Sequence, residues 1–203
     1  MTLLVPRSLW NTFEEHQRWL ESEGKEGCRA DLRSGDLSKL NLQGINLARA
    51  ILTNVVFTGA ILRSADLTEA SLQGAYLKSA DLHWANLLGA NLEGANLTGA
   101  QLQFANFDSA NLVGACLKEA FLHNAWFWKA NCHGADFSQT SLNFTSFRSA
   151  NLKDSKFDQA QLQQTDMRNA DLKESNIFLA EILSADFHGA DLPTDFSSLV
   201  LAK

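Results

Sequence analysis

The chain has 203 residues, of which 45% are apolar and 20% are charged, and its formal net charge at pH 7 is −6. The apolar content excludes a disordered chain. The few prolines, glycines and cysteines exclude collagen-like and disulfide-rich proteins. The acidic excess argues against direct nucleic-acid binding, which requires a surplus of Lys and Arg. Proline occurs only at Pro6 and Pro193, so the chain between them turns by other means.

The start of the chain lacks the features of a targeting segment. Residues 1–6 have no basic region before their short apolar run, so no secretory signal is predicted. No stretch approaches 18 uninterrupted apolar residues, so neither a membrane span nor a membrane partner is expected. The cysteines are odd in number and irregularly spaced, as is typical of reduced thiols. They are Cys28, Cys116 and Cys132. These features predict a soluble cytoplasmic protein.

The N-terminal segment, residues 1–28, contains the pattern of one amphipathic helix at residues 8–23. The helix is predicted to begin either at Ser8 or at a capping box formed by Thr12 and Glu15. Gly24 is its predicted end. We expect the helix to cover the start of the structure that follows. Its mostly apolar stripe consists of Leu9, Phe13, Gln17 and Leu20, with Trp10 beside them.

An unbroken five-residue repeat occupies residues 29–193. Written in fives from Ala30, the chain keeps its register through Leu192 without an insertion. The middle residue of every pentad is apolar, usually Leu or Phe, and the residue two places before it is usually Ala. Asp or Asn is commonest between these two, and the remaining positions are mostly polar or Gly. At 45% apolar content, chance would give such an apolar run with a probability of roughly 10⁻¹¹.

A period of five matches neither a helix nor a continuous strand. A helix would spread the Leu positions around its circumference, and a strand would send successive Leu residues to opposite faces. Each pentad is therefore predicted to be a short extended piece followed by a corner. In the extended piece, Ala and Leu point inward and the residue between them points outward. Gly, Ser, Asn and Asp suit the corner positions without proline.

These pentads resemble a known family. Residues 85–99 read Ala-Asn-Leu-Leu-Gly-Ala-Asn-Leu-Glu-Gly-Ala-Asn-Leu-Thr-Gly and are similar to the pentapeptide-repeat proteins, whose motif is Ala-(Asp/Asn)-Leu-x-x. The resemblance covers residues 30–192. It implies an all-β solenoid, a right-handed quadrilateral β-helix of about eight coils with four pentads per coil and an N-terminal capping α-helix. At roughly 4.8 Å per coil, the rod would be about 40 Å long.

The phenylalanines at the middle position support a four-sided coil. They occupy only alternate pentads, and a four-sided coil places alternate pentads on opposite walls. Two inward columns of large side chains are therefore predicted. One column contains Phe107, Phe127, Phe147, Met167 and Phe187, and the opposite column contains Phe137 and Phe157.

A short apolar tail, residues 194–203, follows Pro193. It is predicted either to fold over the last coil or to join two rods end to end as a homodimer, because an open β-helix ends in unpaired strands and bare core. The apolar residues of the tail are Phe196, Leu199, Val200 and Leu201.

The sequence contains no arrangement typical of catalysis, cofactor binding or metal binding. Most Asp residues follow from the repeat itself. His83 and His123 share a position in the pentad but lie two coils apart, roughly 10 Å, which is too far for one metal ion. Phosphate-binding loops, nucleophile elbows and metal motifs are lacking. No catalytic, cofactor-binding or metal-binding residue is predicted, and an enzyme is not expected.

Outward aromatic residues are the candidate partner-binding residues. Exposed aromatic side chains anchor many protein interfaces. Stacking between neighbouring coils explains them equally well, so a stabilising ladder and a binding site remain alternatives. The candidates are Trp84, Phe104, Phe121, Phe144, Trp126 and Trp128.

Two functions fit this pattern. The first is a noncatalytic protein-interaction or scaffold module that presents a rigid rod to another protein of unknown identity. The alternative comes from the family resemblance and is a DNA-mimicking rod that binds DNA gyrase or topoisomerase and protects it from inhibitors. Residues 29–203 contain 14 Lys and Arg against 18 Asp and Glu, a net charge of only −4. This weak charge, together with the lack of loop insertions, counts against the DNA mimic.

Overall fold

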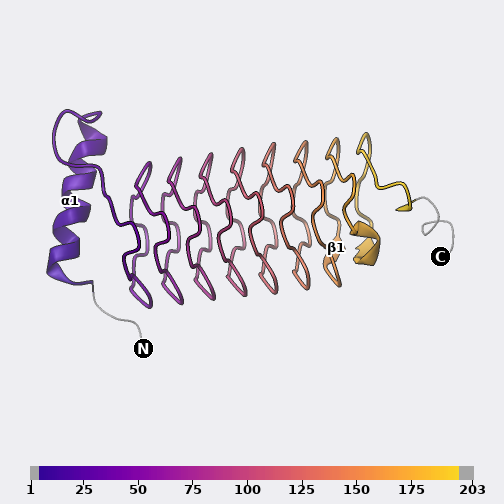
Figure 1. The fold of residues 1–203 in the computed structure, drawn as a ribbon, viewed down its shortest axis with the longest axis horizontal. Helices are drawn as coiled ribbons and strands as arrows, with labels where there is room; N and C mark the ends of the chain where they lie inside the picture. Colours follow the sequence, from indigo (N-terminus) through magenta and orange to yellow (C-terminus); the bar gives the residue numbers. More distant parts are fainter. Residues whose placement is uncertain (1–4, 197–203) are drawn as a thin grey trace.

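The structure, a computed structural model, describes residues 5–196. The chain forms a straight rod of stacked coils that follow one another in sequence order. One helix, α1 (Arg7–Glu21), lies across the N-terminal end of the rod (Figure 1). Within the described residues, no helix has the length and the apolar character needed to cross a membrane.

Each coil contains 20 residues. Parallel bridges join residues 20 positions apart, from Asp31 with Ile51 to Asp171 with Asp191. The distance from Asp31 to Asp191 is 160 residues, which is eight coils of this length. This pairing confirms the predicted quadrilateral β-helix, with one pentad of every coil on each of four walls.

We number the walls and the coils along the chain. Walls 1, 2, 3 and 4 begin with residues 30–34, 35–39, 40–44 and 45–49, and each wall continues every 20 residues. Wall 3 therefore contains the pentads 40–44, 60–64, 80–84, 100–104, 120–124, 140–144, 160–164 and 180–184, which belong to coils 1 to 8.

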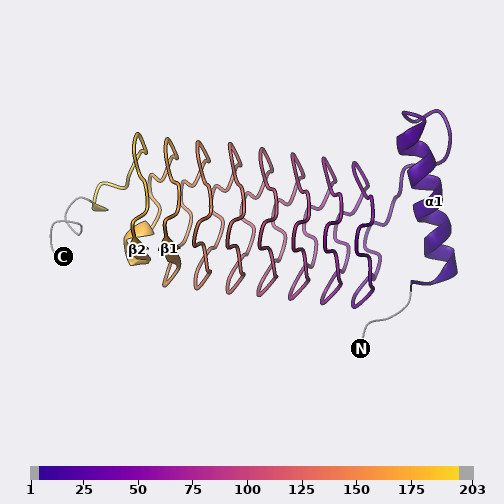
Figure 2. The ribbon, with the colours of Figure 1, turned by 180° about the vertical axis from the view of Figure 1, so that it is seen from behind.

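The extended piece of each pentad is short. Most pentads pair with the next coil through a single bridge. Longer pairing occurs on wall 3, where β1 (Gln161–Gln163) and β2 (Glu181–Leu183) lie side by side and parallel (Figure 2). A typical pentad donates the N–H of Leu52 to the carbonyl of Ser71 at 2.8 Å, and the N–H of Ser71 donates back to Ala50 at 3.0 Å. The coils are thus joined along every wall by backbone hydrogen bonds.

The corner of each pentad is a turn with a left-handed residue. The carbonyl of Leu52 accepts a hydrogen bond from the N–H of Val55 at 3.1 Å, which closes the turn. Asn54, at the last position of that pentad, has a φ of 56°. Turns with a positive φ at their third residue favour Gly and Asn there. This geometry explains how the chain turns repeatedly without proline.

The core confirms the inward positions of the repeat. Every middle residue from Leu37 to Ile177 is buried, and Phe107, Phe127 and Phe147 stack at centroid distances of 4.7 Å. On the opposite wall, Phe137 and Phe157 stack at 5.3 Å. The two columns meet edge to face, as the 82° angle between the Phe137 and Phe147 rings shows. Both predicted columns are therefore present.

Thr or Ser replaces Ala at a few inward positions, and most of these buried hydroxyl groups make a hydrogen bond. The Thr145 hydroxyl donates to the carbonyl of Leu122 at 2.8 Å, and the Thr165 hydroxyl donates to that of Leu142 at 2.9 Å. Because a buried hydroxyl without a partner is destabilising, these bonds allow Thr to occupy a position that otherwise favours Ala.

The last coil departs from the predicted lattice. A 3-10 helix, η1 (Ile177–Leu179), replaces the corner turn of the last pentad of wall 2. Ile182 occupies a middle position and yet is 38% exposed, because no further coil packs on it. Phe196 is buried and its ring lies 5.3 Å from that of Phe187. Phe196 thus folds over the last coil, whereas Leu199, Val200 and Leu201 lie outside the described residues.

The N-terminal helix differs from its prediction in where it begins. It begins at Arg7 after Pro6, and no side chain caps it. Neither Ser8 nor a capping box of Thr12 and Glu15 marks its start, so both predicted starts are wrong. Proline just before a helix removes one N–H that would need a cap. The helix ends at Glu21, two residues before the predicted end, and Gly24 closes it, since the N–H of Gly24, with a φ of 86°, donates to the carbonyl of Trp19 at 2.8 Å.

The buried face of α1 also differs from the predicted stripe. Phe13 is buried against the core of the rod and Leu9 packs beside it. Gln17 is exposed, and His16 is fully buried in its place. The helix is thus rotated so that positions 9, 13, 16 and 20 face the first coil, which is a regular helical spacing.

Candidate functional site

Three aromatic candidates stand at one corner of the rod. Trp84, Phe104 and Phe144 occupy the last position of their wall 3 pentads, at the corner between walls 3 and 4. Their φ values are 60°, 60° and 61°, in the left-handed region. These three residues share one repeat position, and they lie on an edge of the rod rather than on a flat wall.

The backbone gives no reason for aromatic residues at this corner. Left-handed φ costs a bulky residue roughly 1 kcal/mol relative to glycine. Gly44 and Ser64 occupy the same corner in earlier coils, where the chain turns in the same way. The aromatic side chains must therefore be present for their own interactions rather than for the turn.

Part of the corner column is a stacked pair. The rings of Trp84 and Phe104 lie 4.2 Å apart with an angle of 4° between them. Trp84 remains 56% exposed. In the next coil Asn124 interrupts the column, and Phe144 follows with its ring edge-on to His123 at 5.0 Å. Phe144 is also exposed.

Two further aromatic residues flank the interruption. Phe121 on wall 3 and Trp126 on wall 4 belong to the same coil as Asn124, and each is nearly half exposed. The structure therefore brings five of the six candidates to one place. We call this surface the aromatic edge, and it consists of Trp84, Phe104, Phe121, Trp126 and Phe144.

Trp128 lies elsewhere, at the corner between walls 4 and 1. Its backbone N–H donates to the carboxylate of Asp108 at 2.7 Å, and the ammonium of Lys129 lies 4.3 Å from its ring centroid. Burial raises the pKa of Asp108, and the hydrogen bond from Trp128 opposes that rise. Trp128 already has local partners and is separated from the aromatic edge by the width of wall 4.

Wall 3 beside the aromatic edge is uncharged over four successive coils. Its pentads from residue 100 to residue 164 contain no Asp, Glu, Lys or Arg. No other wall has more than two successive pentads without a charged residue. Gln, Asn, Ser and His occupy the outward positions instead. This wall therefore offers hydrogen bonds and aromatic surface without formal charge.

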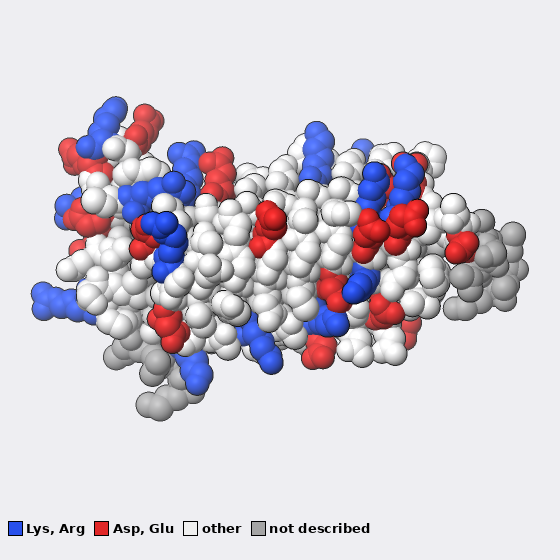
Figure 3. Space-filling view, in the orientation of Figure 1, with Lys and Arg blue, Asp and Glu red and all other residues white. Residues whose placement is uncertain are grey.

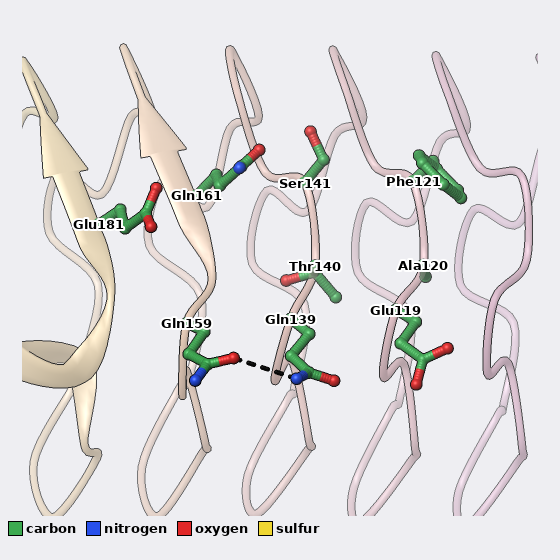
Figure 4. Close-up of a pocket in the computed structure, with 9 residues that line it drawn as sticks. All are labelled: Glu119, Ala120, Phe121, Gln139, Thr140, Ser141, Gln159, Gln161 and Glu181. Carbon is green, nitrogen blue, oxygen red and sulfur yellow. Dashed lines mark hydrogen bonds between the residues drawn. The ribbon is translucent and has the colours of Figure 1, made fainter.

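A shallow hollow crosses wall 3 next to Phe121. Figure 4 shows Phe121, Ser141, Gln161 and Glu181 in one row over four coils, with Gln139 hydrogen-bonded to Gln159 in a second row at 3.0 Å. The hollow has a volume of about 560 Å³ and arises because small Ser141 follows large Phe121. A second hollow of about 390 Å³ adjoins it over β1 and β2. Both are open to solvent, so they suit a broad contact better than an enclosed ligand.

Charged residues elsewhere are paired between neighbouring coils. Examples are Lys118 with Asp136 at 3.2 Å and Lys153 with Asp171 at 3.1 Å. On the face drawn in Figure 3, acidic and basic side chains are interspersed and gather towards the two ends of the rod. That face has no continuous acidic stripe of the kind that imitates a nucleic-acid backbone.

Comparison with known families agrees with the repeat. The family model for pentapeptide repeats matches with eight copies, over residues 41–78, 75–114, 85–124, 115–154 and 155–192. The chain belongs to the pentapeptide repeat family. A comparison of this pentapeptide repeat protein with curated proteins gave no match.

Solved pentapeptide repeat proteins share the fold. HetL, described as involved in heterocyst differentiation regulation in the cyanobacterium Nostoc sp. strain PCC 7120, is 26% identical with a TM-score of 0.50. The match covers 87% of this chain and 91% of HetL. A trypsin-treated form of QnrB1, described as a plasmid-mediated fluoroquinolone resistance protein, is 18% identical with a TM-score of 0.55 and coverages of 85% and 86%.

Hydrogen bonds and burial shift the pKa values of several titratable groups of this pentapeptide repeat protein. Asp81 accepts hydrogen bonds from Arg63 at 2.5 Å and His83 at 2.9 Å. Burial favours the neutral carboxyl, but these bonds hold the pKa of Asp81 below its ordinary value. Burial raises the pKa of the Cys132 thiol, which keeps it protonated. Among residues 5–196, no three His, Cys, Asp or Glu residues are grouped to hold a metal ion.

His16 is a buried group that the repeat pattern does not reveal. Its Nδ1 accepts a hydrogen bond from the N–H of Ala30 at 3.1 Å, and its ring stacks on Trp19 at 5.7 Å. Its Nε2 is buried and has no hydrogen-bond partner among the described residues. Burial lowers the pKa of His16, the backbone of Ala48 partly opposes this, and nearby Arg29 adds to the lowering. A neutral imidazole thus joins α1 to the first coil.

We expect the N-terminal cap to lose stability in mild acid. The pKa of His16 is lowered from its ordinary value of 6.5, so the unfolded chain binds a proton more readily than the folded cap. The contribution of His16 is therefore complete above pH 7 and decreases as the pH falls below 6.5, by up to about 1.4 kcal/mol per pH unit. Thermal unfolding of the wild type at pH 7.5 and 5.5 measures this loss. His16→Asn keeps a neutral acceptor and should show a smaller loss, whereas equal losses would contradict the role of His16.

Proposed function

We propose that this pentapeptide repeat protein is a noncatalytic interaction module of the cytoplasm that binds a protein partner through the aromatic edge and wall 3. The observation that carries this proposal is the placement of Trp84, Phe104 and Phe144 at left-handed corners of wall 3, which has no charged residue in the four coils that begin with the pentad of Phe104. Exposed aromatic residues next to neutral polar ones are typical of the centre of a protein interface, where charged residues are depleted.

Stacking for stability explains only part of the aromatic edge. Trp84 and Phe104 stack on each other, which is worth about 0.5–1.5 kcal/mol. Within the described chain, neither Phe121 nor Trp126 has a ring contact with another aromatic residue. Both nevertheless hold large exposed rings at positions where the repeat favours Asp or Asn. A binding role accounts for all five residues, whereas a ladder accounts for two.

Binding to gyrase is the less favoured alternative. The likeness to QnrB1, at 18% identity, is a likeness of fold. The interspersed charges and the net charge of −4 over residues 29–203 do not favour imitation of DNA. The likeness to HetL, which is described as involved in regulation, is compatible with a noncatalytic role in contact with another protein.

Capture from an extract of the native host tests the proposal. Trp84→Gly with Phe104→Gly should lose the partner that the wild type retains, because the double variant removes two anchors and leaves turns that glycine adopts readily. Ser109→Gly with Ser149→Gly is the matched control, since both serines are left-handed corner residues on another edge. Retention of the partner by the first pair would contradict the proposal, and capture of gyrase together with relief of quinolone inhibition would support the alternative.

A further inference from the structure

We infer that wall 3 and the aromatic edge form the interface of a weak antiparallel dimer, in which two rods lie side by side. This inference rests on the proposed function and names the partner of the same surface as a second copy of this chain. Three properties of the surface carry it, namely its axial repeat, its distribution of charge and the order of its large and small side chains.

The axial repeat of wall 3 matches that of a second rod. Outward side chains recur every coil, at a spacing of about 4.8 Å, over eight coils. A second copy has the same spacing, so its side chains stay in register with those of the first along the whole wall. A two-fold axis gives such a self-complementary contact without further assembly.

The distribution of charge selects the antiparallel arrangement. Wall 3 carries Arg63 and Asp81 near its N-terminal end and Glu181 near its C-terminal end. A parallel pair would place Glu181 of both copies at one level. An antiparallel pair with its axis between coils 4 and 5 places Glu181 level with uncharged Asn41, and Arg63 level with uncharged Gln163. The antiparallel pair therefore keeps Arg63, Asp81 and Glu181 far from their own copies, whereas Glu119, at the corner between walls 2 and 3, lies about one coil from its copy and weakens the contact.

The order of side chains suits the same axis. Coil 3 then faces coil 6 of the second copy, so Trp84 lies opposite Phe144. Coil 4 faces coil 5, so Phe104 lies opposite Asn124 and fills the interruption in the aromatic column. Phe121 lies opposite the amide of Gln101. The rings of Trp84, Phe104, Phe121 and Phe144 thus meet either another ring or a neutral amide that donates and accepts hydrogen bonds, whereas Trp126, on wall 4, lies outside the contact.

The size of the surface predicts a weak association. Eight coils are about 38 Å long, and the three extended residues of a pentad are about 10 Å wide. With its corner side chains, each copy therefore buries roughly 400–600 Å² of surface. The total, about 1,000 Å², lies at the low end of specific interfaces. We therefore expect a dimer that forms at micromolar concentrations and dissociates on dilution.

Charges introduced at Asn124 test the arrangement. This residue lies next to the proposed axis, where the two copies bring residue 124 within about one coil spacing of each other. Lys129 and Glu119 occupy the same corner position in neighbouring pentads, with φ values of 56° and 58°, so Asn124→Lys and Asn124→Glu should both fold. Each variant alone should dimerise at least tenfold more weakly than the wild type, because like charges meet. An equal mixture of the two should recover the affinity of the wild type.

Sedimentation equilibrium of the full chain, from about 1 to 500 μM, reads out the result. A mass that rises to twice that of the monomer, with loss in each charged variant and recovery in the mixture, supports the inference. A monomer at every concentration overturns it. A dimer that forms equally well in both Asn124 variants but is lost in Phe196→Ser also overturns it. That result would indicate an end-to-end contact. If the rod stays monomeric while Trp84→Gly with Phe104→Gly still abolishes capture of another protein, the proposed function stands and only this inference fails.

Discussion

Leu122→Asp is expected to unfold the middle of the rod. Leu122 is fully buried in the core, between coils that leave no space for water. An aspartate there would be an unpaired charge in an apolar interior, or a neutral acid without a hydrogen-bond partner. Either outcome costs about 4 kcal/mol or more, a large part of the 5–15 kcal/mol that stabilises a typical domain. Loss of the thermal transition, followed by circular dichroism, measures this effect.

Phe121→Asp is the matched control for that prediction. It introduces the same side chain one residue earlier, at the outward position where Asp81 stands on the same wall. Its transition should stay close to that of the wild type, because the new carboxylate faces solvent. Equal damage by both variants would contradict the assignment of inward and outward positions.

Phe127→Ala is expected to destabilise the central coils by about 3–5 kcal/mol. The ring of Phe127 lies at the centre of its column, 4.7 Å from the rings of both Phe107 and Phe147, and 6.1 Å edge-on from Phe137. Its removal leaves a cavity that the backbone hydrogen bonds between coils prevent from closing. Faster hydrogen exchange of the amides in the coils around residue 127 measures the effect even if the ends of the rod remain folded.

Trp126→Ala provides the comparison for Phe127→Ala. Trp126 is the adjacent residue and a larger one, but it is 45% exposed. Its loss should change hydrogen exchange in the same coils much less. If truncation of Trp126 proved the more damaging, the aromatic edge would be part of the framework of the rod rather than a surface held for a partner.

The lattice could be predicted from the sequence because each pentad repeats one physical requirement. Leu122 and Ala125 point inward for the same reason as their equivalents in every coil, and the alternation of Phe residues predicts the four walls. The uncharged stretch of wall 3 is also readable once the walls are known, because every twentieth residue shares a wall. The repeat in the sequence thus predicts the features that all coils have in common.

The features that occur once could not be predicted in this way. His16 becomes buried because α1 is rotated against the first coil, and that rotation depends on contacts with Ala30 and Trp19 rather than on helical periodicity. Ile182 is partly exposed because the lattice ends above it. Both features belong to the ends of the rod, where no neighbouring coil imposes the lattice.

The central claim is that the aromatic edge exists for a partner and not for stability, and the unfolding free energy of Trp84→Gly with Phe104→Gly tests it most directly. The lost stacking, about 0.5–1.5 kcal/mol, should be offset by glycine at two left-handed positions, each worth roughly 1 kcal/mol. We expect the double variant to lie within about 1 kcal/mol of the wild type, or above it. A loss of more than about 2 kcal/mol would show that the aromatic edge is a structural ladder and would contradict the account.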